Sequence, residues 1–178
     1  MTLYSHAASE LPRVPRVLED RSIALRPETA ADAAFVERLY IANRWDEMAP
    51  TGWSDDEKVS FLQQQQRFQL IHYQTYYRDA ARGIITSGGE AIGRLYVLKM
   101  AGDIRIVDIA IVPEQRSRGI GTALILAVFD QARQDGAKVS IHVEQFNPAR
   151  RLYDRLGFEP AGDKGIYTLM EWTPSSAA

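Results

Sequence analysis

Cysteine is absent from this sequence of 178 residues. Its absence excludes disulfide bonds, thiolate metal sites and a cysteine nucleophile. It is also compatible with a reducing compartment, because cytosolic proteins rarely depend on disulfides. We therefore expect a cytoplasmic protein that binds no metal.

Long apolar runs and an excess of charge of one sign are also lacking. No stretch is long and apolar enough to cross a membrane, and the first residues lack the basic-then-apolar order of a signal peptide. The formal net charge is −2, with both signs mixed along the chain. We therefore expect no membrane partner and no binding to nucleic acid.

The sequence shows no internal repeat and no linker that would divide it. Its apolar content of 46% predicts one domain with a sizeable core. We place this domain at residues 21–173. An extended or partly ordered arm with two prolines precedes it over residues 1–20, and a small polar tail follows over residues 174–178.

The most informative segment begins as a strand and continues into a helix. β-Branched residues dominate 104–112, and apolar residues then recur at helical spacing over 119–135, with Gly136 as the expected stop. In the loop between them, Gly119 and Gly121 lack side chains, and the first N–H groups of the helix have no acceptor inside it. This arrangement favours binding of a phosphate group.

Two common nucleotide-binding motifs fit this loop poorly. A Walker A loop needs a lysine followed by Ser or Thr, and no lysine follows Gly119 or Gly121. The dinucleotide motif needs a third small residue where Leu124 stands. A structural interpretation, in which the glycines shape a helix start and the arginines add solubility, also stays open.

A second informative segment covers residues 138–158. Residues 138–143 alternate as a strand, and Asn147 is a favourable N-cap with Pro148 at the first helical position. Apolar residues line one face of this short helix, and Gly157 ends it.

The remaining chain alternates helices and short strands, which predicts an α+β fold with mixed layers. On the long helix, we expect the run Gln63–Gln66 to face solvent and most of the aromatic side chains to join the core. The predicted elements are a strand at 21–26, a helix from Thr29 to Ala42 with Asp32 in its capping box, a long helix from Ser54 to Arg78 with Glu57 in its capping box, a β-hairpin over 82–98, and a closing hairpin over 158–172.

The two informative segments together resemble the signatures of the Gcn5-related N-acetyltransferase (GNAT) superfamily. Pro113-Glu-Gln-Arg-Ser-Arg-Gly-Ile-Gly121 is similar to its pyrophosphate loop, and Asn147 followed by an Ala-x-x-Leu-Tyr helix and Leu-Gly-Phe158 is similar to its second motif. The resemblance covers about Ser22 to Trp172. It implies a GNAT-like acyl-CoA N-acyltransferase fold, with a mostly antiparallel central sheet, splayed fourth and fifth strands and flanking helices.

The resemblance also implies acetyl-CoA as the cosubstrate. Its pyrophosphate would lie on the loop amides and its pantetheine arm along the preceding strand, where an N–H near Ile111 would stabilise an oxyanion. Arg116, Arg118, Arg150 and Arg151 are either counter-charges for phosphate or solubilising surface residues. The cofactor-binding residues that we predict are Ile109, Ala110, Ile111, Val112, Arg116, Ser117, Arg118, Gly119, Ile120, Gly121, Thr122, Asn147, Arg150 and Tyr153.

Tyr153 is the predicted acid that protonates the leaving thiolate, because it matches the tyrosine of the family motif. The alternative is a core tyrosine on the apolar face of its helix. For the base, we predict His142 or Asp108 in catalysis, with Glu144 as a third candidate. Asp108 is an unusual charge for an apolar strand, and Glu144 shares a strand face with His142.

The leading functional hypothesis is an acetyl-CoA-dependent N-acetyltransferase that transfers acetyl directly to an amine of a small molecule or a protein. A non-catalytic CoA-binding module of the same fold, or an unrelated α/β binding protein, are the alternatives. The acceptor region would include the long helix and the final hairpin, and family members often form homodimers, so a homodimer is possible here. The sequence does not identify the acceptor.

Overall fold

The computed structural model describes residues 8–175, except for the side chain of Lys164. Within residues 8–175 the chain forms a seven-stranded sheet in the order β1-β2-β3-β4-β5-β7-β6. Neighbouring strands are antiparallel except for the parallel pair β4 and β5. The strands are β1 (Ile23–Pro27), β2 (Ala81–Ser87), β3 (Glu90–Met100), β4 (Asp103–Ile111), β5 (Lys138–Glu144), β6 (Glu159–Lys164) and β7 (Tyr167–Trp172).

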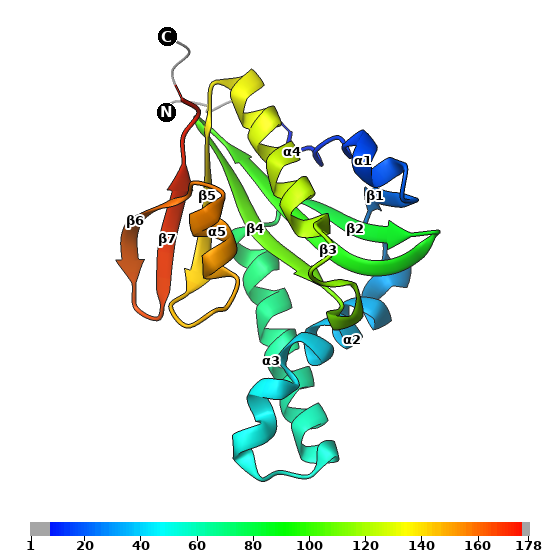
Figure 1. The fold of residues 1–178 in the computed structure, drawn as a ribbon. Helices are drawn as coiled ribbons and strands as arrows, with labels where there is room; N and C mark the ends of the chain where they lie inside the picture. Colours follow the sequence, from blue (N-terminus) through cyan, green and yellow to red (C-terminus); the bar gives the residue numbers. More distant parts are fainter. Residues whose placement is uncertain (1–7, 176–178) are drawn as a thin grey trace.

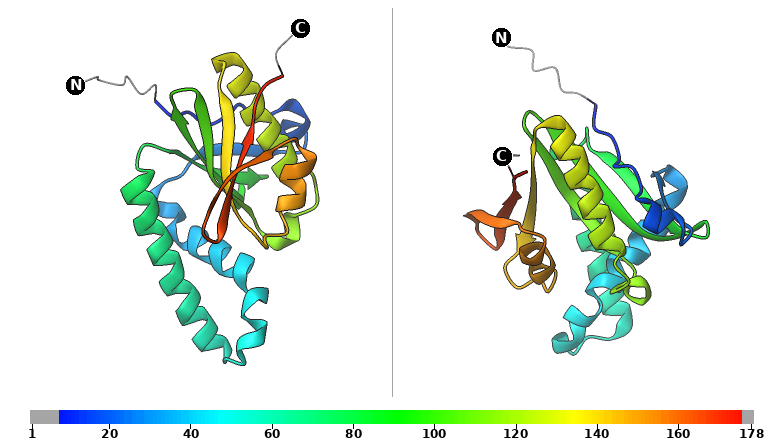
Figure 2. Two further views of the ribbon diagram at one scale, coloured as in Figure 1. Left: turned by 90° about the vertical axis from the view of Figure 1, so that its left-hand side faces the viewer. Right: turned by 45° about the horizontal axis from the view of Figure 1, so that its top comes forward.

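Helices cover both faces of the sheet, which confirms the predicted α+β fold. α4 and α5 lie on one face, and α2 and α3 lie on the other, where their helical hairpin extends beyond the sheet (Figures 1 and 2). The helices are α1 (Arg16–Glu19), α2 (Ala33–Arg44), α3 (Asp55–Tyr76), α4 (Ile120–Asp135) and α5 (Arg150–Arg155).

The alternation of side chains in the strands divides the core between these two faces. Ile85, Leu95 and Val97 belong to the main apolar cluster with α4. Their neighbours on the opposite face of β2 and β3 include Ile84 and Tyr96, which are also fully buried. The face under α4 is therefore apolar, whereas the face under α2 and α3 mixes apolar and polar groups.

The buried line of α3 is partly polar, and this differs from the prediction. Gln66 lies inside the run expected to face solvent, yet it is buried, one turn from the buried Leu62. Tyr73 continues this line and joins the core as expected. Phe68 and Tyr76 are exposed, so the expectation that they join the core was wrong.

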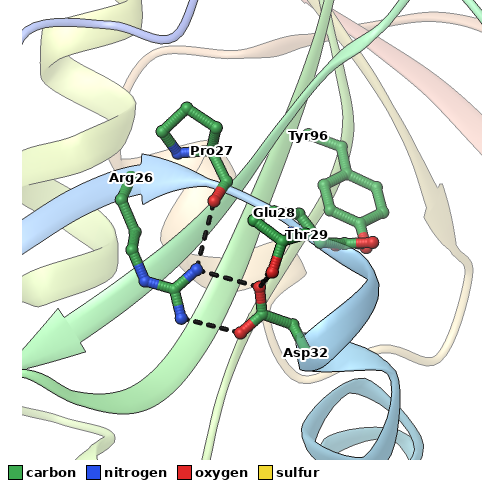
Figure 3. A network of polar contacts seen from close by, with 6 residues as sticks. All are labelled: Arg26, Pro27, Glu28, Thr29, Asp32 and Tyr96. Carbon is green, nitrogen blue, oxygen red and sulfur yellow. Dashed lines mark hydrogen bonds and ion pairs between the residues drawn. The ribbon is translucent and has the colours of Figure 1, made fainter.

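The predicted capping boxes form at both helical starts on this face. Ser54 and Glu57 begin α3, with Ser54 N–H donating to Glu57 Oε2 at 2.8 Å. Thr29 N–H donates to Asp32 Oδ2 at 2.8 Å, before a single 3₁₀ turn that leads into α2. Arg26, at the end of β1, also contacts both oxygens of Asp32 (Figure 3).

The last helix begins later than predicted. α5 starts at Arg150, and Ala149 rather than Asn147 is its N-cap. The reason is a turn before the helix, in which Asn147 Oδ1 accepts a hydrogen bond from Ala149 N–H at 2.9 Å. Gly157 follows the helix with a φ of +89°, as predicted for its stop.

The described part of the N-terminal arm is packed against the domain. Leu18 in α1 is fully buried in the main cluster. Leu11 lies so close to Gly83 of β2 that a Cβ on that glycine would approach Leu11 Cδ2 to 2.8 Å. Ser9 Oγ accepts a hydrogen bond from Lys99 N–H at 3.0 Å. Residues 1–7 of the predicted arm and 176–178 of the predicted tail lie outside the described residues.

Candidate active site

A gap opens where β4 and β5 stop pairing. Asp103 to Ile106 pair with Lys138 to Ile141, and beyond these four residue pairs the two strands part, as predicted (Figure 1). The second half of β4 keeps β3 on one side and has no strand partner on the other. Its N–H groups on that side are therefore available to a ligand.

A β-bulge lies at the same point of β4. Tyr96 of β3 pairs with Asp108, whereas the next residue, Val97, pairs with Ile106, so Val107 is an extra residue in the ladder. An extra residue reverses the faces to which the following side chains point. Asp108 consequently lies on the α2–α3 face, although Ile106 two residues earlier packs in the cluster under α4.

The N–H groups of Ile109 and Ile111 face the gap. Val112 N–H donates to Ile92 O of β3 at 2.9 Å. Because successive N–H groups of a strand point to opposite sides, those of Ile111 and Ile109 point away from β3. The carbonyl of Ala110 takes the place where Gly93 of β3 would carry a side chain, so the two backbones lie close together here.

The loop before α4 has the backbone expected of an anion site. Ser117 and Gly119 have positive φ values of 59° and 76°. The first hydrogen bond of the helix runs from Ala123 N–H to Gly119 O at 3.0 Å, so the amides of residues 120–122 have no acceptor within the helix. Open space surrounds Gly119 on the side where a Cβ would stand.

Two arginines connect this loop to the rest of the domain. Arg116 donates from Nε to Ile111 O at 3.2 Å and from Nη2 to Asn43 Oδ1 at 2.6 Å, so its guanidinium links β4 to α2. Arg21, directly after the arm, donates to Arg118 O at 2.9 Å. Among the predicted counter-charges, Arg116, Arg118 and Arg151 are exposed and Arg150 is half-buried.

Tyr153 lies in α5 with a buried side chain whose ring meets Phe158 edge-on, with 5.7 Å between ring centroids. Burial raises the pKa of the Tyr153 hydroxyl well above its ordinary value, and the negative charge of Asp108 raises it further. The hydroxyl is therefore protonated at neutral pH. It also lies within electrostatic reach of Asp108 across the gap.

The three candidate bases share the α2–α3 face but differ in their partners. Asp108 forms an ion pair with the buried Arg94 and accepts a hydrogen bond from Tyr73 Oη at 3.2 Å. Glu144 forms an ion pair with Arg44 of α2 at 3.0 Å. His142 alternates in β5 with two side chains of the main cluster, so it lies on the same strand face as Glu144.

Sequence reasoning missed Arg94, Tyr73 and Arg44. Arg94 carried a usable signal, because a charged residue inside the apolar stretch of β3 is as unusual as Asp108 in β4. Tyr73 carried none beyond its aromatic character, since its partner lies 35 residues away. Arg44 is one of many charges on α2, and its pairing across 100 residues depends on the fold.

Within residues 8–175, every helix is too short or too polar to span a membrane. The same described residues contain no group of three or more His, Asp or Glu side chains that could hold a metal ion.

Solved structures of the same architecture define the class of fold. The PaiA N-acetyltransferase of Thermoplasma acidophilum, in complex with coenzyme A, superposes with a TM-score of 0.64 at 17% identity, covering 86% of this chain and 99% of that one. The ribosomal-protein-S18-alanine N-acetyltransferase of Escherichia coli gives 0.55 at 18% identity, covering 88% and 96%. These likenesses establish a GNAT-type acyltransferase fold.

Sequence comparison identifies the family. The model of the acetyltransferase (GNAT) family matches residues 31–158, and the chain belongs to this family. A protein of Bacillus subtilis (strain 168), provisionally named a ribosomal protein bS18-alanine N-acetyltransferase, is 31% identical over 88 residues. That match spans 48% of this chain and 58% of the relative's length.

Proposed function

We propose that this protein transfers the acetyl group of acetyl-CoA directly to an amine of a small molecule or a protein. The observation that carries the proposal is the gap between β4 and β5. Asp108 and two outward N–H groups lie on the part of β4 that borders this gap, and the loop suited to bind phosphate follows directly after it. The family membership and a solved relative with coenzyme A support the same cosubstrate.

In this proposal the cosubstrate follows β4 into the gap. The amides of residues 116–122 hold the pyrophosphate, with Asn147 and Arg150 beside the cofactor. The pantetheine arm runs along residues 109–112, and the N–H of Ile111 donates to the thioester oxygen, where negative charge develops as the amine attacks. Arg116 holds the carbonyl of Ile111 and thereby fixes the end of this strand.

The chemistry needs one proton acceptor and one proton donor. The neutral amine nitrogen bonds to the thioester carbon, the C–S bond breaks, and the nitrogen gives up its proton. Asp108 or His142 accepts that proton, directly or through water. Tyr153, which burial keeps protonated, donates to the departing sulfur. Glu144, which pairs with Arg44, remains the third candidate base.

The acceptor lies on the α2–α3 side of the gap, where all three acidic or basic candidates face. The names of two similar proteins specify N-acetylation of an alanine of a ribosomal protein, which makes a peptide amine one acceptor to test. A small polyamine or amino acid is the alternative. The acceptor group is therefore an amine, and the experiments below identify the molecule that carries it.

The first test is calorimetric titration with acetyl-CoA. A bulky residue at Gly119 obstructs the loop, but its positive φ also strains any side chain. Gly136, at the other end of α4, has a similar φ and similarly open surroundings. We expect Gly119→Trp to abolish micromolar binding and Gly136→Trp to retain it. Equal effects of the two substitutions would contradict a loop site.

The second test is thiol release from acetyl-CoA with three amines: spermidine, free alanine and a short peptide with N-terminal alanine. Turnover with any of these amines supports the transferase. Tight binding of acetyl-CoA without turnover across a wider amine panel would instead favour a non-catalytic CoA-binding module of the same fold.

A further inference from the structure

Arg94 is a buried cation for which the catalytic scheme has no role. Its side chain is 3% exposed, on the face of β3 that α3 covers. Nη2 contacts Asp108 and donates to Gln69 Oε1 at 2.7 Å, while Nε and Nη1 are buried and have no hydrogen-bond partner within the described part of the chain. A buried guanidinium with two unsatisfied groups is costly to the fold. Such a cost suggests that the ion pair of Arg94 with Asp108 has a function.

Two elements hold the carboxylate of Asp108 by the same oxygen. Arg94 from β3 and Tyr73 Oη from α3 both contact Oδ2, the latter at 3.2 Å. Burial and the charge of Asp108 raise the pKa of Tyr73 well above its ordinary value, so its hydroxyl remains a donor. The orientation of the carboxylate is thus fixed from the protein side.

The other oxygen, Oδ1, accepts no hydrogen bond from residues 8–175. The Asp108 side chain is 16% exposed, so solvent or a ligand reaches it. The bulge at Val107 turns Asp108 to the acceptor side, and Tyr153 lies within electrostatic reach on the other side of the gap. Oδ1 is therefore the oxygen available to a reacting group.

We propose that Arg94 and Tyr73 are positioning residues that direct Asp108 Oδ1 at an acceptor bound as an ammonium ion. The inference rests on the proposed transferase and assigns the amine's proton to Asp108 rather than to His142. One ammonium proton passes to Oδ1, directly or through one water, and from there to solvent, so the nitrogen becomes neutral and attacks the thioester carbon. The C–S bond breaks as Tyr153 protonates the sulfur, the second nitrogen proton passes to Oδ1, and Tyr153 regains its proton from solvent. Arg94 and Tyr73 act only through the carboxylate.

Tyr73→Phe carries the test because it removes one oxygen atom and keeps the ring in contact with Tyr77 and Tyr96. With the best amine of the panel, we expect kcat/KM for the amine to fall about tenfold, as for the loss of one hydrogen bond to a charged group. Binding of acetyl-CoA should change less than about twofold. Tyr76→Phe, on the exposed side of the same helix, should leave kcat/KM unchanged.

A double-mutant cycle separates positioning from a general structural role. Asp108→Asn should lower kcat/KM at least about a hundredfold, as for the loss of a general base. If Tyr73 acts through Asp108, then adding Tyr73→Phe to Asp108→Asn should cost nothing further. Additive losses, or a wild-type rate in Tyr73→Phe, would overturn this inference while the transferase stands. A wild-type protein without turnover would overturn both.

Discussion

Gly93 stands in β3 at a point where no side chain fits. The carbonyl oxygen of Ala110 occupies the space that a Cβ would need, and Ile85 Cδ1 lies 3.1 Å from the same point. The close approach brings the end of β4 against β3, which orients the outward N–H groups of Ile109 and Ile111. A single missing methyl group thus sets the backbone geometry of the proposed acyl site.

We expect Gly93→Ala to lower the free energy of unfolding by about 1–3 kcal/mol, because the β4 backbone must move to admit the methyl group. Binding of acetyl-CoA should weaken in the same variant. Gly162→Ala in β6 is the control, since its Cβ would meet open space. Denaturant unfolding measures the stability of both variants. Equal stabilities would contradict the close approach of the β4 backbone to Gly93.

Individual site residues differ in how far the sequence reveals them. Asp108 and Tyr153 were recognisable, one as a charge in an apolar strand and the other by motif. The bulge at Val107 was not recognisable, because an extra residue in a ladder depends on the register with a partner strand. Because the bulge was not recognisable, neither the face to which Asp108 points nor its ion pair with Arg94 could be predicted.

At the scale of single elements, local signals predicted the helix starts well, and tertiary contacts decided the buried faces. The capping boxes at Thr29 and Ser54 need only four residues each, so the sequence contains all of their information. The buried line of α3 includes Gln66 and Tyr73, which bury polar atoms against the sheet. Its apolar period is therefore weak, and no local rule identifies its inner face.

The start of α2 should make stability depend on pH. Hydrogen bonds from Arg26 and then from Thr29 N–H hold the pKa of Asp32 well below its usual range. A carboxyl whose folded pKa is depressed stabilises the fold above its unfolded pKa of about 3.9 and loses this contribution as pH falls toward the folded value. The stability difference between wild type and Asp32→Asn should thus be full at pH 6 and smaller at pH 3.

Urea unfolding at the two pH values measures this difference. Glu57→Gln is a matched control, because Glu57 closes the other capping box and has no arginine partner there. The stability difference between wild type and Glu57→Gln should also become smaller from pH 6 to pH 3, but by less than for Asp32→Asn. A wild-type advantage over Asp32→Asn that stays constant from pH 6 to pH 3 would show that the ionised carboxylate contributes nothing.

At the scale of the whole molecule, the N-terminal arm belongs to the same packed unit as the catalytic domain. Leu18 lies in the main cluster with residues of α4 and the sheet, and Arg21, directly after the arm, donates to the carbonyl of Arg118 in the loop before α4. This packing was not predictable from the sequence, because the arm has no periodicity and its partners are distant. Packing of irregular segments depends on the finished fold.

Leu18→Ala should lower the free energy of unfolding by about 2–5 kcal/mol, since it removes a fully buried side chain and leaves a cavity. Val17→Ala, at the neighbouring position where the side chain is 60% exposed, should change it by less than about 0.5 kcal/mol. Thermal or denaturant unfolding distinguishes the two. Equal small effects would mean that the arm detaches readily from the folded domain.

The short parallel pairing of β4 with β5, over four residue pairs, also affects the order in which the sheet folds. Strands β2 to β4 form an antiparallel meander in which tight turns close the hairpins β2–β3 and β3–β4, whereas β5 joins β4 only through the longer connection that contains α4. Contacts between distant segments carry a larger entropic cost and form more slowly. We therefore expect the meander to assemble early and the parallel junction late, so the gap is among the last features that the folding chain acquires.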